Sequence, residues 1–112
     1  MEPPMPPDLP TPIAAYFAAA NAANGPRAAL CFTLDAVVVD EALPRRGTAE
    51  IAAWVVETQR KYRCTATPSA IAVEGTRARV AATVAGDFPG SPVALDYLFT
   101  LADGRISRLE IG

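Results

Sequence analysis

Residues 32–54 read FTLDAVVVDEALPRRGTAEIAAW, and within this stretch a strand pattern gives way to a helix pattern. A short apolar strand ends at Asp40-Glu41, and a loop closes with Arg46-Gly47. After the loop, Ile51 and Trp54 are spaced so that both lie on the inward face of a helix. A strand and a helix in direct succession predict a domain of the α+β kind.

Asp40 is the polar end of this strand. The strand period of two places Asp40 on the same face as Ala36 and Val38, while Val37 and Val39 take the other face. If the first face is interior, desolvation raises the pKa of the carboxyl, which suits a general base working near neutral pH. The alternative is that Asp40 only ends the strand at the solvent rim.

Two helices are predicted before this stretch. Thr11-Pro12 gives a capping hydroxyl followed by proline at the first helical position, and Asn24-Gly25-Pro26 ends the helix. Tyr16 lies on its buried stripe, which consists of Ile13, Tyr16, Phe17 and Ala20. A shorter helix is expected over residues 26–32, and a third begins near Thr48.

The second half of the chain has the pattern of strands separated by turn dipeptides. Four strands are expected, at about 64–73, 76–88, 92–101 and 105–111, in an antiparallel meander. The predicted fold is α+β, with three N-terminal helices packed on one face of a curved, mainly antiparallel sheet. The sheet consists of the short first strand and the meander. Residues 1–11 are expected to form a disordered Pro-rich arm, which leaves residues 12–112 as the folded domain.

The strand at 92–101 is partly apolar on both faces. Val93, Leu95, Tyr97, Phe99 and Leu101 share one face, and Ala94 and Leu98 lie on the other. Helices cover one face, so we expect a second subunit to cover the other in a homodimer formed through the sheet.

Composition excludes several classes of function. Ten Lys and Arg against twelve Asp and Glu give a net charge of −2, so no nucleic-acid partner is expected. The sequence contains no long uncharged apolar run and no secretory signal pattern, so we expect no membrane partner and a cytoplasmic location.

Histidine is absent, which removes the commonest general base and the commonest metal ligand. Cys31 and Cys64 lack the spacing of a metal site and are expected to be small buried hydrophobes, so no metal or cofactor is predicted. Any acid–base chemistry must then come from carboxylates and phenols.

The pieces of sequence in register resemble the SnoaL-like branch of the nuclear transport factor 2-like superfamily. These pieces are Tyr16-x4-Asn21, Phe32-x2-Asp35-Ala36-Val37-x2-Asp40, Arg46-Gly47-x3-Ile51-x2-Trp54 and Asp103-Gly104-Arg105-Ile106. The resemblance covers nearly everything after residue 11. It implies a cone-shaped fold whose sheet curls around an apolar pocket, in a superfamily that includes isomerases, polyketide cyclases and proteins without chemistry.

Within this superfamily the first half looks most like ketosteroid isomerase. The resemblance gives Tyr16 the role of an oxyanion-hole donor, Asp40 that of the general base, and Asp96 that of a neutral acid completing the oxyanion hole. Strand alternation instead turns Asp96 away from the core, because its neighbours Leu95 and Tyr97 are the more apolar set. The register of the last hairpin decides between the two placements.

The sequence and the resemblance together indicate two candidate functions. The first is acid–base catalysis, such as enolisation or isomerisation, on a small apolar carbonyl compound, by a ketosteroid-isomerase-like or polyketide-cyclase-like enzyme with Asp40, Tyr16 and Asp96 as its catalytic residues. The alternative is a non-catalytic ligand-binding or dimerisation module. In both, Phe32, Trp54 and Phe88 are expected to line the pocket, which lies between the helices and the concave sheet.

Overall fold

The computed structural model describes residues 8–112, in which two helices, two strands and a third helix precede a final four-stranded meander. In chain order the elements are α1 (Thr11–Asn21), α2 (Gly25–Ala29), β1 (Phe32–Asp40), β2 (Leu43–Arg46), α3 (Gly47–Tyr62), β3 (Thr65–Glu74), β4 (Arg77–Ala85), β5 (Val93–Ala102) and β6 (Arg105–Ile111). Residues 1–7 of the predicted arm lie outside the described residues, and α1 begins at Thr11, within the arm's predicted bounds.

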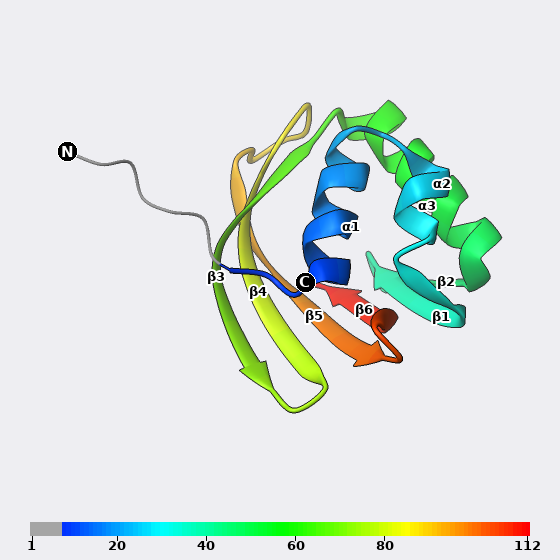
Figure 1. Cartoon of the computed structure of the whole chain (residues 1–112). Coiled ribbons are helices and arrows are strands. Elements are labelled where there is room, and N and C mark those ends of the chain that lie inside the picture. Colours follow the sequence, from blue (N-terminus) through cyan, green and yellow to red (C-terminus); the bar gives the residue numbers. More distant parts are fainter. Residues whose placement is uncertain (1–7) are drawn as a thin grey trace.

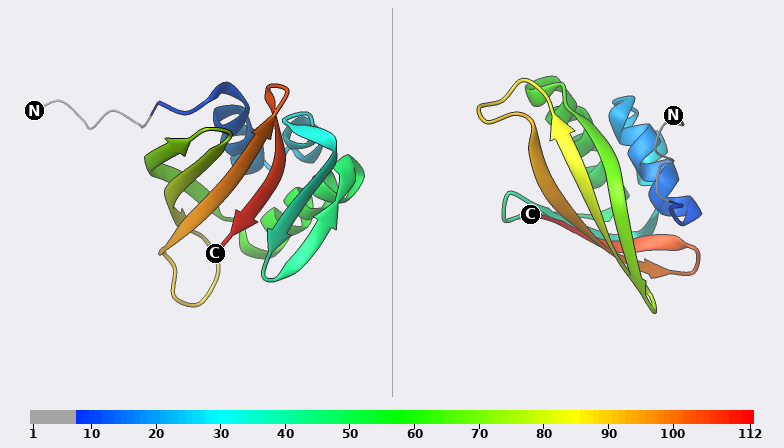
Figure 2. Two further views of the ribbon diagram at one scale, coloured as in Figure 1. Left: turned by 90° about the horizontal axis from the view of Figure 1, so that it is seen from below. Right: turned by 90° about the vertical axis from the view of Figure 1, so that its left-hand side faces the viewer.

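The strands form one mixed sheet in the order β2-β1-β6-β5-β4-β3. Strands β1 and β6 run parallel, and the other neighbouring pairs are antiparallel. The long strands β3, β4 and β5 curve around α1 (Figure 1). All three helices lie on one face of the sheet, and the opposite face is uncovered (Figure 2). The predicted α+β class, with helices on one side of a curved sheet, is confirmed.

The core lies between the helices and the concave face of the sheet. Its largest fully buried side chains come from both layers and are Phe32, Phe99, Ile13, Ile51, Ile106, Leu109, Val38 and Val80. Two-residue alternation in β4 and β5 produces the inner wall, because every second side chain of a strand points to the same face. No helix among residues 8–112 is long and apolar enough to cross a membrane.

Strand β1 is longer than predicted, and β2 replaces part of a predicted loop. Phe32 already pairs with Ile106 of β6, a contact with a distant segment that local pattern does not reveal. Strand β2 returns from β1 through a two-residue turn, Glu41-Ala42, whose φ angles are +53° and +61°. Such turns favour Asn or Gly, so this pair carries no hairpin signal.

This turn predicts the effect of a glycine substitution. Ala42→Gly is expected to raise the free energy of unfolding by about 1 kcal/mol, because glycine adopts a positive φ without steric cost. Ala53→Gly, at an exposed position inside α3, is the matched control and should lower it by about 1 kcal/mol. Chemical denaturation of both variants measures the two changes. Equal losses of stability would show that Ala42 is not held in the left-handed conformation.

Candidate functional site

A cavity of about 320 Å³ lies between the helices and the inner face of the sheet. This volume is at the lower end of the range for small-molecule sites, so the cavity suits a compact ligand. Helix α1, the end of β1, helix α3 and strands β3 to β6 all contribute to its wall. Its lining is dominated by six aromatic side chains: Tyr16, Phe17, Trp54, Tyr62, Phe88 and Tyr97.

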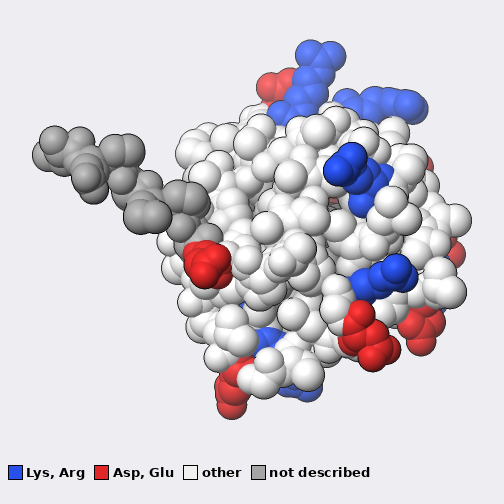
Figure 3. Space-filling model, viewed as in Figure 1, with Lys and Arg blue, Asp and Glu red and all other residues white. Residues whose placement is uncertain are grey.

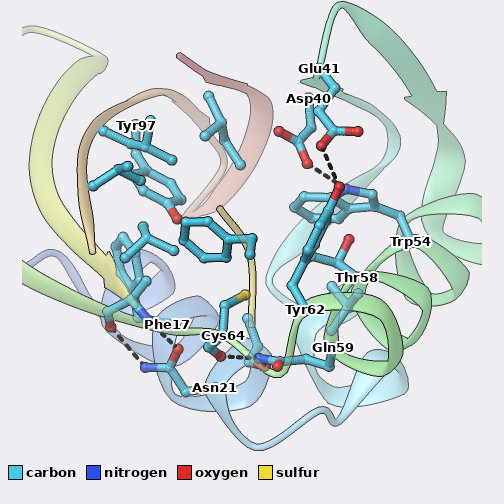
Figure 4. Close-up of a pocket in the computed structure, with 18 of the residues that line it drawn as sticks. Phe17, Asn21, Asp40, Glu41, Trp54, Thr58, Gln59, Tyr62, Cys64 and Tyr97 are labelled. Atoms are coloured by element: carbon cyan, nitrogen blue, oxygen red, sulfur yellow. Dashed lines mark hydrogen bonds between the residues drawn. The ribbon is translucent and has the colours of Figure 1, made fainter. Parts of the chain in front are cut away.

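The charged groups of the cavity wall are all acidic. Asp40 and Glu41 line it, and no Lys or Arg occurs among its described lining residues. Figure 4 shows both carboxylates at the same end of the cavity, beside Trp54 and Tyr62. Such a wall disfavours anionic ligands and favours neutral ligands with an apolar body.

Asp40 ends β1 on the buried face of that strand, as the period of two predicts. Its Oδ2 atom accepts a hydrogen bond of 3.0 Å from the indole Nε1 of Trp54. Burial raises the pKa of the Asp40 carboxyl above its usual value, and the nearby charge of Glu41 acts in the same direction. The Trp54 hydrogen bond and the Arg45 charge lower this pKa, and burial has the larger effect. Asp40 is therefore a desolvated carboxylate held in one orientation.

Tyr16 lies on the buried stripe of α1, and only 3% of its surface is exposed. Its ring stacks on Trp54, with 6.5 Å between the ring centres, and meets Phe17 edge-on at 5.3 Å. Burial is the main cause that raises the pKa of the Tyr16 phenol well above its usual value. The nearby Tyr97 and Asp40 raise this pKa further. The structure records no hydrogen-bond partner for its hydroxyl among residues 8–112, and no buried polar side-chain atom there is sealed without a partner. The Tyr16 hydroxyl is thus a neutral donor open to the cavity.

A second carboxylate–aromatic pair lies beside the Asp40–Trp54 pair at this end of the cavity. The Tyr62 hydroxyl donates to Oε1 of Glu41 at 3.0 Å, and Phe88 meets the Tyr62 ring edge-on at 5.9 Å. Lys61 Nζ lies 4.9 Å from the centre of the same ring. These contacts tie the end of α3 to the β1–β2 turn and to the loop before β5.

Two amides fix the floor of the cavity. Gln59 Nε2 donates to the backbone oxygens of Ala20 and Cys64, both at 2.7 Å. Asn21 exchanges two hydrogen bonds of 2.9 Å with the backbone of Ala66. Together these hydrogen bonds link α1, which carries Tyr16, to α3, which carries Trp54, and to β3.

The structure brings together four of the six predicted site residues. Tyr16, Asp40, Trp54 and Phe88 line the cavity. The prediction that Phe32 lines it is wrong: Phe32 is 1% exposed and packs edge-on against Tyr16 at 5.7 Å, behind the cavity wall.

Asp96 also requires a correction, because it is exposed and does not line the cavity. In β5 the buried positions are Tyr97 and Phe99, so alternation turns Asp96 to the uncovered face. The hairpin register fixes this placement, with Tyr97 opposite Ile111 and Leu98 opposite Glu110. The resemblance to the neutral acid of ketosteroid isomerase therefore does not extend to the position of this side chain.

The cavity groups that were not predicted as site residues include Tyr97, Glu41 and Tyr62. The sequence pattern places Tyr97 on the apolar face of its strand, and the hydroxyl of this side chain is the feature that could have indicated a polar group in the cavity. Glu41 follows Asp40 directly, and Tyr62 stands at the end of α3, so their pairing depends on tertiary structure. Of the two cysteines, Cys31 is buried as predicted, and Cys64 is half-buried at the cavity wall. Residues 8–112 contain no cluster of three potential metal ligands among His, Cys, Asp and Glu.

An α+β cone with a ligand-sized cavity is a scaffold of small-molecule-pocket proteins. The sequence profile of the SnoaL-like domain matches residues 13–109, and the chain belongs to this family. The resemblance to the SnoaL-like family is thereby confirmed. No curated protein matches the chain at a significant level.

Solved structures agree with this assignment. A candidate polyketide cyclase from Sinorhizobium meliloti is 42% identical, with 94% of this chain and 96% of that chain covered and a TM-score of 0.90. A candidate polyketide cyclase from Xanthomonas campestris is 20% identical, with 90% and 86% covered and a TM-score of 0.75. A protein of ketosteroid isomerase-like fold from Catenulispora acidiphila, in complex with trimethylamine, is 20% identical, with 94% and 86% covered and a TM-score of 0.83. The last two show the fold alone.

The environment of Asp40 predicts how stability changes with pH. Because its folded-state pKa is raised, the unfolded chain loses this proton first as pH rises, and the free energy of unfolding falls across that window. Asp40→Asn should therefore melt at a higher temperature than the unmodified protein at pH 7. The difference should shrink as pH falls toward the usual carboxyl value of 3.8.

Asp96→Asn is the matched control, since this exposed side chain should change the melting temperature little. Thermal melts followed by circular dichroism over a pH series measure these differences. An Asp40→Asn variant that melts lower at pH 7 would contradict a destabilising, desolvated carboxylate.

Proposed function

We propose that this protein binds a compact, mostly apolar carbonyl compound in its cavity and enolises it, with Asp40 as general base. The observation that carries the proposal is the desolvated Asp40 carboxylate in the same aromatic cavity as the Tyr16 hydroxyl, for which residues 8–112 provide no hydrogen-bond partner. A raised pKa brings the base closer to the proton affinity that carbon acids require at neutral pH. Trp54 holds one carboxylate oxygen, so the other is available to accept a proton.

In the proposed step, Asp40 removes a proton from the carbon beside the carbonyl group. The electron pair of that C–H bond moves toward the carbonyl, and negative charge develops on its oxygen. Tyr16 donates a hydrogen bond to this oxygen, which lowers the barrier because the oxygen carries more charge in the transition state than in the bound ketone. When a C=C bond is conjugated with the enolate, return of the proton from Asp40 to the far end of this system gives an isomer. Attack of the enolate carbon on a second carbonyl of the same molecule forms a C–C bond and breaks the π bond of that carbonyl, and Asp40 returns its proton to the new alkoxide to give a ring.

The second outcome has support from the relative that is 42% identical and is a candidate polyketide cyclase. Ring closure of a chain with several carbonyl groups begins with the same loss of a proton beside a carbonyl. The aromatic wall, which contains no basic residue among its described lining, suits such a neutral substrate. The cavity volume of about 320 Å³ favours a small one.

A second candidate function is ligand binding without turnover in the same cavity. Its support is the aromatic and acidic wall, a lining that also holds small organic cations by cation–π attraction. The complex of the Catenulispora acidiphila protein with trimethylamine shows that a structure of this fold binds a small amine. This candidate requires no proton transfer by Asp40.

Hydrogen–deuterium exchange of a small ketone separates the two candidates. Cyclohexanone in D₂O with the unmodified protein is expected to gain deuterium beside its carbonyl faster than with buffer alone. Asp40→Asn should slow this exchange by about 10²–10⁴-fold with little change in ketone affinity, because a base is lost and the shape is kept. Proton NMR measures the exchange rate, and calorimetry measures the affinity.

Asp96→Asn is the control, since it removes a carboxylate from the uncovered face and should leave exchange unchanged. Exchange that equals the buffer rate, together with ketone binding, would favour the binding module. Equal losses in both variants would contradict the assignment of Asp40 as the base.

We also propose a homodimer that covers the outer face of the sheet. This face carries a groove where Leu98 and Val73, exposed at 38% and 61%, lie among charged side chains of both signs. The basic members are Arg77, Arg79 and Arg108, and the acidic members are Glu74 and Glu110. A two-fold axis could oppose the two signs across one apolar centre. Figure 3 shows another view of the surface, in which the centre is largely uncharged and most charged side chains lie toward the top, the right and the lower edge.

Sedimentation equilibrium tests this arrangement. A dimer at micromolar concentration is expected, and Leu98→Arg should convert it to a monomer by placing a like charge beside the arginines of the groove. The control is Leu34→Arg, since Leu34 is 80% exposed on β1 and does not line the groove. A monomeric unmodified protein would refute the dimer.

A further inference from the structure

Tyr97 is a buried phenol that has no role in the reaction proposed above. It lines the cavity and is 6% exposed. A buried tyrosine hydroxyl normally has a hydrogen-bond partner in the protein. The described residues provide none for Tyr97, and no buried polar side-chain atom among them is sealed off without a partner. Its hydroxyl therefore opens into the space that a ligand would fill.

The ring of Tyr97 is held firmly. Strand β5 is flanked by β4 and β6, with Tyr97 opposite Val80 on one side and Ile111 on the other. Phe17 meets its ring edge-on at 5.0 Å, and Phe99 stacks on it at 6.3 Å. A hydroxyl on such a ring is a preorganised donor, which costs no reorganisation when charge develops on a bound oxygen. In Figure 4 Tyr97 reaches into the cavity from the side opposite Trp54.

Tyr16 and Tyr97 line the same cavity as Asp40. Burial raises the pKa of Tyr97, with further effects from Cys64 and Asp40. The pKa of Tyr16 is likewise raised by burial first, and Tyr97 is the next cause. Phe17 contacts both rings edge-on, at 5.3 Å and 5.0 Å. Both hydroxyls thus keep their protons near neutral pH, in the aromatic cavity that the desolvated Asp40 carboxylate also lines.

We propose that the Tyr97 hydroxyl is a second hydrogen-bond donor to the carbonyl oxygen, so that Tyr16 and Tyr97 together bind the oxygen on which charge develops. This inference rests on the proposed function. Tyr97 thereby fills, from the next position along β5, the role that the family resemblance gives to Asp96. The alternation of side chains along β5 explains why Tyr97 takes this role in place of Asp96, because only Tyr97 of these two neighbours faces the cavity. This arrangement implies the substrate class, which is a neutral carbonyl compound. Its oxygen accepts two hydrogen bonds, and its acidic C–H group faces Asp40.

Binding of 4-nitrophenol tests this donor pair. Its oxygen resembles an enolate oxygen, and its neutral and ionised forms differ in absorbance. Tyr97→Phe and Tyr16→Phe should each weaken binding by about tenfold, the usual effect of losing one hydrogen bond to a partly charged oxygen. Thr100→Val, which removes a hydroxyl from the opposite face of the same strand, is the control and should leave affinity unchanged.

Ketone exchange by the same variants separates this inference from the proposed function. Tyr97→Phe is expected to slow the exchange of cyclohexanone while the affinity for this neutral ketone changes less than that for 4-nitrophenol. If Tyr97→Phe binds 4-nitrophenol as tightly as the unmodified protein, or if the unmodified protein does not bind it, the second donor is refuted. If Tyr97→Phe weakens binding but the unmodified protein catalyses no exchange, the donor pair stands and enolisation fails.

Discussion

One hydrogen bond joins the two layers of the fold at the cavity: Trp54 Nε1 donates to Asp40 Oδ2 at 3.0 Å. It connects the middle of α3 to the last residue of β1, and it holds a carboxylate that burial would otherwise drive toward the neutral form. The same indole stacks on Tyr16, so the proposed base and the proposed donor both contact one side chain. Removing this bond would leave a partly buried carboxylate without its donor, a costly arrangement in any protein.

Features that lower stability are concentrated at this end of the cavity. Asp40 is desolvated, and the next two residues, Glu41 and Ala42, both hold positive φ angles. Strained backbone and perturbed carboxylates are found together at functional sites, where the rest of the fold compensates for them. Here the compensation comes from the aromatic packing around Tyr16 and from the hydrogen bonds that the side-chain amides of Gln59 and Asn21 make. The combination of a desolvated carboxylate and a strained turn is more typical of a functional site than of a structural element that only packs.

Local sequence pattern predicted the parts of the site that depend on periodicity. The strand period placed Asp40 with Ala36 and Val38, and the helical stripe placed Tyr16 inward, as the structure has them. The same alternation predicted the inner face of β5 and thus the outward position of Asp96. The residues that pattern missed depend on distant partners. Glu41 meets Tyr62 through tertiary contact, and β2 follows a turn without Asn or Gly.

A carbon NMR titration of the Asp40 carboxyl, in the unmodified protein and in Trp54→Phe, tests the central claim most directly. The account predicts a midpoint above the usual value of 3.8 in the unmodified protein, because burial is the largest influence on this pKa. It predicts a still higher midpoint in Trp54→Phe, because the lost hydrogen bond favours the ionised form. A midpoint at or below 3.8 in the unmodified protein would contradict a desolvated base at this position.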